Sequence, residues 1–133
     1  MIKNNIYNIT IFELDDIRKN AKINNDHLVE IQGKEIQSWD EYLDVIEIVY
    51  KFPTGWRVNI HGYIDWMLDL DWLGKNSYIL IIHDYSDFLK QNMETKKMVM
   101  EIFEEEILPW WQSDVEKYCA GGKAKPFNVY LVN

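Results

Sequence analysis

The chain has 133 residues, which fits one domain of ordinary size and leaves little room for a second. Hydrophobic residues make up 47% of the chain and aromatic residues 14%, a content that excludes a disordered polar segment. Fourteen lysines and arginines against 22 aspartates and glutamates give a formal net charge of -8. This charge disfavours nucleic acid or an anionic membrane as the direct partner and favours a basic protein.

The amino terminus and the cysteine content bear on location and on metal binding. Polar side chains interrupt residues 1–8, and no stretch has the apolar length of a membrane span, so we expect a cytoplasmic protein. The single cysteine, Cys119, excludes an intramolecular disulfide and provides no paired-cysteine metal motif. The histidines, His27, His61 and His83, lack the spacing of a helix-borne zinc pair. We therefore predict no metal and no cofactor.

Residues 1–25 are predicted to form an amino-terminal extension. A strand-like run over residues 6–14 precedes a polar stretch over residues 15–26, which leaves room for an added strand and a short helix.

The core domain is predicted to cover residues 26–133. It begins with a short strand over residues 27–31 that ends at Gly33. Ser38 and Glu41 then have the spacing of a capping box, which predicts that a helix begins at Ser38.

A second, short helix is predicted over residues 63–73. The loop before it, residues 52–62, contains Pro53 and Gly55, and Gly74 is well placed to end the helix.

The second half of the core domain is predicted to contain two strands and two helical segments. The apolar run over residues 78–82 does not alternate, which is typical of a central strand covered on both faces. A helical pattern follows over residues 94–108, Pro109 kinks or restarts it, and residues 110–119 form a further helical segment. Residues 127–132 form the last strand. The alternation of strands and helices predicts an α/β domain with a small three-stranded parallel sheet flanked by helices.

Four short segments of this core domain follow one another in a particular order. They are Val29 to Gly33 before the Ser38 helix, Gly62 to Asp69, Ile79 to Ile82, and Gly121-Gly122 followed by Pro126 to Val129. This order resembles the barstar family of ribonuclease inhibitors over roughly residues 27 to 133. The resemblance implies a barstar-like fold and an inhibitor without enzymatic activity, which neutralises a ribonuclease toxin inside the producing cell.

The resemblance also implies acidic site residues. In the family, the second helix follows a glycine and carries two aspartates four residues apart that contact the basic active site of the ribonuclease. Asp65 and Asp69 match these two positions. A third acidic residue of the family's interface lies five residues before the glycine that precedes the last strand. Glu116 matches it if that glycine is Gly121.

Aromatic residues of the family's binding loop have their nearest counterparts in Trp56 and Tyr63. The family usually has an asparagine two residues before the first aspartate, where this chain has Tyr63.

The spacing of the two aspartates suits this role on physical grounds. Residues four apart on a helix lie one turn apart on the same face, so Asp65 and Asp69 can present both carboxylates to one site. Trp72 falls near the same stripe and can act as an aromatic anchor. Because a ribonuclease holds an RNA phosphate with basic side chains, a rigid carboxylate pair can take the place of that phosphate and block the site.

Three alternatives use the same residues differently. Asp65 and Asp69 also fit the solvated side of an amphipathic helix. A barstar-like adaptor with a non-nuclease partner is suggested by Tyr63 and by the extension. A small hydrolase that uses the two carboxylates as catalytic groups is a third, less favoured hypothesis.

Overall fold

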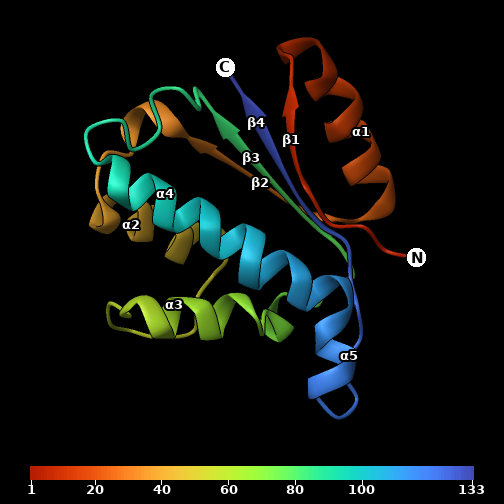
Figure 1. The fold of residues 1–133 in the computed structure, drawn as a ribbon. Coiled ribbons are helices and arrows are strands. Elements are labelled where there is room, and N and C mark those ends of the chain that lie inside the picture. The colour runs from red at the N-terminus through yellow and green to blue at the C-terminus, as the bar shows by residue number, and fades with distance from the viewer.

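A four-stranded parallel sheet runs through the computed structural model, which describes residues 1–133 (Figure 1). Its strands are β1 (Ile6–Ile9), β2 (His27–Gln32), β3 (Tyr78–His83) and β4 (Phe127–Val132), in the spatial order β1-β4-β3-β2. β3 pairs with both β2 and β4, so the apolar run is an interior strand as expected.

The sheet contains one strand more than the three that the sequence predicted, and the additional strand comes from the extension. β1 pairs in parallel with β4, with Ile6 opposite Val129 and Ile9 opposite Val132. Without β1, the outer main-chain groups of β4 would form an unpaired sheet edge. The prediction of a three-stranded sheet was therefore wrong.

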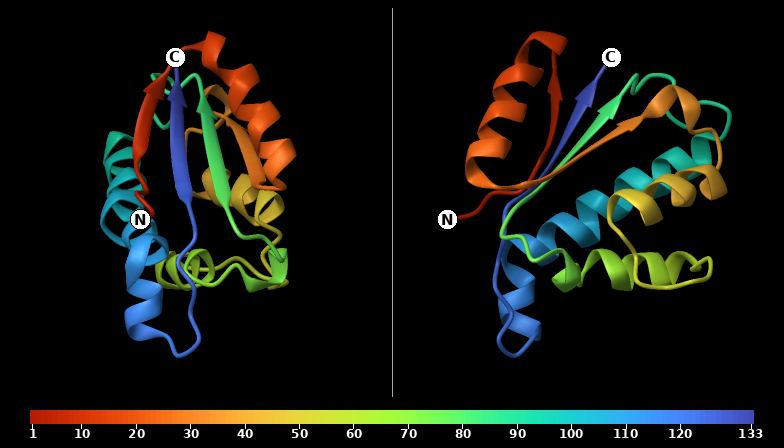
Figure 2. Two further views of the ribbon diagram at one scale, coloured as in Figure 1. Left: turned by 90° about the vertical axis from the view of Figure 1, so that its right-hand side faces the viewer. Right: turned by 180° about the vertical axis from the view of Figure 1, so that it is seen from behind.

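Helix α1 (Leu14–Asn24) covers one face of the sheet, and most of the remaining helical segments cover the other face (Figure 2). Leu14 of α1 is buried against Ile81 of β3. The neighbouring residues of β3, Leu80 and Ile82, belong to the large core cluster with the other helices. Both faces of β3 are thus covered, which explains the absence of hydrophobic alternation in its sequence.

Helix α2 (Trp39–Val49) begins at the predicted cap. The Ser38 hydroxyl accepts a hydrogen bond from the Glu41 main-chain N–H at 3.1 Å. The Glu41 carboxylate accepts from the N–H of Gln37 at 2.9 Å, one residue before the cap. The cap therefore forms with a slightly longer reach than the usual capping box.

A nearly continuous helix occupies residues 93–118 (Figure 1). It consists of α4 (Met93–Ile102), two π-helical segments over Phe103–Ile107 and Trp110–Asp114, and α5 (Val115–Tyr118). Pro109 keeps helical dihedral angles of -63° and -36°. Because proline has no N–H for the carbonyl four residues earlier, the helix widens locally instead of ending. Pro109 therefore does not restart the helix.

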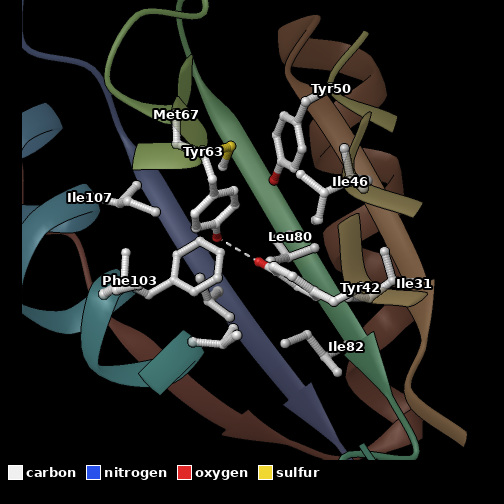
Figure 3. Close-up of a cluster of buried hydrophobic side chains, with 14 of the residues drawn as sticks. Ile31, Tyr42, Ile46, Tyr50, Tyr63, Met67, Leu80, Ile82, Phe103 and Ile107 are labelled. Carbon is white, nitrogen blue, oxygen red and sulfur yellow. Dashed lines mark hydrogen bonds between the residues drawn. The ribbon is translucent and has the colours of Figure 1, made fainter. Parts of the chain in front are cut away.

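The main core lies between the sheet and the helices α2, α3 (Ile60–Met67) and α4. Figure 3 shows Tyr42 of α2 and Tyr63 of α3 pointing toward one another inside this core, with their hydroxyl oxygens 2.6 Å apart. Both side chains are fully buried, so this hydrogen bond joins α2 to α3 within apolar surroundings.

Candidate functional site

Helix α3 begins earlier than the sequence predicted. The side chain of Asn59 accepts a hydrogen bond from the N–H of Gly62 at 2.8 Å, so Asn59 caps the helix and Ile60 is its first residue. Asparagine is among the best N-cap residues, and this signal was missed in the sequence. The predicted start at residue 63 was therefore wrong.

Helix α3 also ends earlier than predicted, at Met67. Leu70 is fully buried and has a left-handed backbone with a φ of 55°, which breaks the helical path. A 3-10 turn over Asp71–Leu73 follows, and Gly74 ends that turn with a φ of 64°. The predicted single helix over residues 63–73 is thus a helix and a separate turn.

Asp65 and Asp69 lie in different elements but close to one another. Asp65 is exposed on α3, whereas Asp69 lies in the turn after it, where its N–H donates to the carbonyl of Trp66 at 3.1 Å. The expectation that one helix carries both aspartates was wrong. Their side chains nevertheless line the same surface hollow.

We call this depression, of about 360 Å³, the acidic hollow. Neither Asp65 nor Asp69 takes part in any of the ion pairs of the molecule. Asp69 accepts one hydrogen bond, from the main-chain N–H of Asp71 at 3.2 Å. Two carboxylates without a basic partner therefore face the hollow, which is lined by Thr54, Trp56, Val58, Gly62, Asp65, Trp66 and Asp69.

Tryptophan side chains provide much of the wall. Trp56 is 72% exposed and lines the hollow. Trp66 also lines it and was not predicted, although its main-chain carbonyl accepts the hydrogen bond from Asp69 and so holds the two residues close together. Trp72 does not line the hollow. It packs edge-on against Trp66 with ring centroids 5.2 Å apart and donates its indole N–H to the Tyr50 carbonyl at 2.8 Å.

Tyr63 is not available to a partner. Its side chain is fully buried and its hydroxyl group is bonded to Tyr42. Burial raises the pKa of Tyr63 well above its ordinary value, so the hydroxyl stays neutral. The prediction that Tyr63 contacts a partner was wrong, because the position faces the core.

Glu116 is exposed on α5 but does not line the acidic hollow. Its carboxylate accepts a hydrogen bond from the main-chain N–H of Ala124 at 2.9 Å. This bond joins α5 to the segment after Gly121 and Gly122. A side chain on Gly122 would lie 2.4 Å from the Val115 carbonyl oxygen, so only glycine fits there. The structure thus gives Glu116 a role in holding this turn.

A second hollow, of about 380 Å³, shares Asp69 with the acidic hollow. Asp69 and Asp71 line it together with Lys123 and Lys125. Burial first, and then the negative charges of Asp71 and Asp69, raise the pKa of Tyr78 to about 12. Asp69 therefore lines two hollows. The charged groups of the first are all acidic, and the second has charged groups of both signs.

Comparison with known proteins identifies the scaffold that carries the acidic hollow. The family model described as Barstar (barnase inhibitor) matches residues 26–131. The chain belongs to the barstar family. This match includes every residue of the acidic hollow and leaves β1 and α1 outside. No curated protein and no solved structure matches the chain.

No group of three or more histidine, cysteine, aspartate or glutamate side chains is arranged to hold a metal ion. None of the helices combines the length and the hydrophobicity that crossing a bilayer requires.

Proposed function

We propose that this barstar-family chain inhibits a ribonuclease by placing the acidic hollow over the basic active site of the enzyme. The observation that carries this proposal is the pair of carboxylates, Asp65 and Asp69, which lack basic partners and line one hollow beside Trp56 and Trp66. Within the barstar family, whose model is described as a barnase inhibitor, such a surface is suited to a basic enzyme.

The proposed mechanism is occlusion without bond making or breaking. A ribonuclease holds the RNA phosphate with cationic side chains, and carboxylate oxygens can accept the same charge-assisted hydrogen bonds. The exposed ring of Trp56 adds apolar contact area next to the charges, as aromatic anchors do in tight interfaces. The net charge of -8 favours a basic partner over nucleic acid or an anionic membrane.

The test is an RNA-cleavage assay with barnase as the first enzyme, and then with ribonucleases captured by the immobilised chain. The chain should inhibit a ribonuclease in stoichiometric amounts. Asp69→Ala should weaken the complex by at least about 2 kcal/mol, or roughly 30-fold, because it removes a charged group from the centre of the interface.

Asp16→Ala is the matched control, since Asp16 is an exposed aspartate of α1 on the opposite side of the sheet. It should leave inhibition unchanged. Full inhibition by a correctly folded Asp69→Ala variant would remove the acidic hollow from the proposed site.

A second function, an adaptor for a non-nuclease protein, is supported by the extension. β1 and α1 lie outside the matched region, and Tyr63 is buried where the family usually has an asparagine. Capture of a partner that lacks ribonuclease activity, with binding that depends on Asp69, would favour the adaptor over the inhibitor.

A further inference from the structure

The loop between α2 and α3, which presents Trp56, has few hydrogen bonds of its own. No main-chain hydrogen bond joins residues 53–58 to one another or to the rest of the chain. The only local bond runs from the Thr54 hydroxyl to the Trp56 carbonyl at 3.2 Å. Phe52 and Val58 are buried at the two ends of the loop, but Trp56 between them is 72% exposed. Packing therefore does little to hold Trp56 in place.

Arg57, the next residue, ties this loop to α2. Its guanidinium group donates to the main-chain carbonyl of Asp40 at 3.0 Å and to the Asp40 carboxylate at 3.2 Å. It also donates to the Asp44 carboxylate, and its Nε lies 3.2 Å from the Glu47 carboxylate. One cation thus contacts three carboxylates along one face of α2.

The geometry of this cluster depends on arginine. The planar guanidinium group offers five N–H donors in fixed directions, so it can reach acidic side chains on successive turns of a helix at once. An isolated exposed ion pair holds a loop weakly, whereas a network around one well-placed guanidinium is more effective. The three acidic side chains would repel one another without the cation.

We infer that Arg57 is a positioning residue that clamps the loop to α2 and thereby fixes Trp56 at the wall of the acidic hollow. Trp56 and Arg57 are adjacent in the chain, so holding the guanidinium restricts the main chain that carries the indole. Arg57 itself does not line the hollow. The effect of the clamp on ribonuclease binding rests on the proposed function, but its effect on Trp56 does not.

The direct test measures the motion of Trp56 in the free protein by ¹⁵N NMR relaxation, with its signals assigned from Trp56→Phe. In the wild type, the Trp56 amide should have an order parameter near about 0.85, as in rigid main chain, and in Arg57→Gln it should fall below about 0.6. Arg57→Lys, which keeps the charge without the planar group, should give only partial rescue. Asp44→Asn, a change on the other side of the clamp, should also loosen Trp56.

The matched control is Arg18→Gln, which breaks a bidentate arginine–carboxylate pair with Glu30 far from this loop. It should leave the Trp56 signals unchanged, and the Trp66 signals should stay rigid in all variants. An order parameter of Trp56 that does not change in Arg57→Gln would overturn the inference.

A double-mutant cycle then tests the consequence for binding. In the inhibition assay, Arg57→Gln should weaken binding by about three- to tenfold in the wild-type background and should add nothing to Trp56→Ala. Equal effects of Arg57→Gln in both backgrounds would show that Arg57 does not act through Trp56. Failure of the proposed function is recognised separately. In that case Asp69→Ala would also have no effect on inhibition.

Discussion

The hydroxyl groups of Tyr42 and Tyr63 satisfy one another inside the apolar core, and nothing else bonds to either group. Tyr63→Phe would leave the Tyr42 hydroxyl buried without a partner. We expect the free energy of unfolding to fall by about 1–3 kcal/mol, measured by urea denaturation.

The double variant Tyr42→Phe/Tyr63→Phe provides the control for this pair, because it removes both polar groups. Its cost should be smaller than the sum of the two single costs. Since Tyr63 is buried away from the acidic hollow, folded Tyr63→Phe should inhibit as well as the wild type. Additive costs in the double variant would argue against the hydrogen bond.

His27 makes the stability of the fold depend on pH. It is partly buried, its Nε2 lies 3.0 Å from the Val49 carbonyl, and burial lowers its pKa below the ordinary value of 6.5. As the pH falls below 6.5, the unfolded chain therefore binds a proton on His27 more readily than the folded chain does. The free energy of unfolding should therefore decrease as the pH falls below 6.5. Above pH 6.5, the titration of His27 should not change it.

Urea denaturation between pH 7 and pH 5 measures this effect. His27→Gln, which keeps a donor for the Val49 carbonyl but does not titrate, should lose less stability over the same range. The lowered pKa of Glu30, caused first by its hydrogen bonds with Arg18, affects stability only at more acidic pH, below its ordinary value of 4.5. Equal slopes for the wild type and His27→Gln would exclude His27 as the source.

At the scale of elements, the sequence predicted those parts of the fold that depend on local pattern. The capping residue Ser38 located the start of α2, and an unbroken apolar run located β3. The end of α3 was not predictable in this way, because the left-handed backbone of Leu70 accompanies burial of its side chain in the core. The pairing of β1 with β4 joins residues more than 120 positions apart, and no local signal in β1 specifies its partner.

The site was predictable to a similar extent. The spacing of Asp65 and Asp69 brought the two carboxylates to one surface, as the structure has them. Whether an aromatic residue of this region faces the core or the solvent depends on tertiary packing, which separates buried Tyr63 from exposed Trp56. The same packing places Trp66 in the wall of the hollow and Trp72 behind it, in contact with the Trp66 ring.

Helix α1 of the extension is predicted to be held on the sheet mainly through Leu14. Leu14 is 2% exposed and anchors α1 on the sheet, whereas Ile23 of the same helix is 80% exposed. Leu14→Ala should lower the free energy of unfolding by about 2–4 kcal/mol, as truncation of buried leucines does, while Ile23→Ala should change it by less than about 0.5 kcal/mol. Denaturant unfolding of both variants checks this, and equal effects would mean that α1 is not anchored through Leu14.

At the scale of the whole molecule, the sheet separates the extension from the candidate site. α1 lies on one face, and α2, α3 and α4 lie on the other (Figure 2). Asp16 on α1 and Asp65 on α3 are both exposed aspartates, so each contributes the same charge to the molecule. Only Asp65 of the two lines the acidic hollow. This pair allows the effect of total charge on binding to be separated from the effect of the acidic hollow.

Charge reversal at these two positions tests that separation. At low ionic strength, both Asp16→Lys and Asp65→Lys should slow association with the ribonuclease, because each makes the chain less acidic by the same amount. This effect should fade above about 0.1 M salt, where the screening length is about 10 Å. Only Asp65→Lys should speed dissociation, since only its side chain lines the acidic hollow. Stopped-flow kinetics at several salt concentrations measures both rates. If Asp16→Lys sped dissociation as much as Asp65→Lys does, the interface would extend to α1.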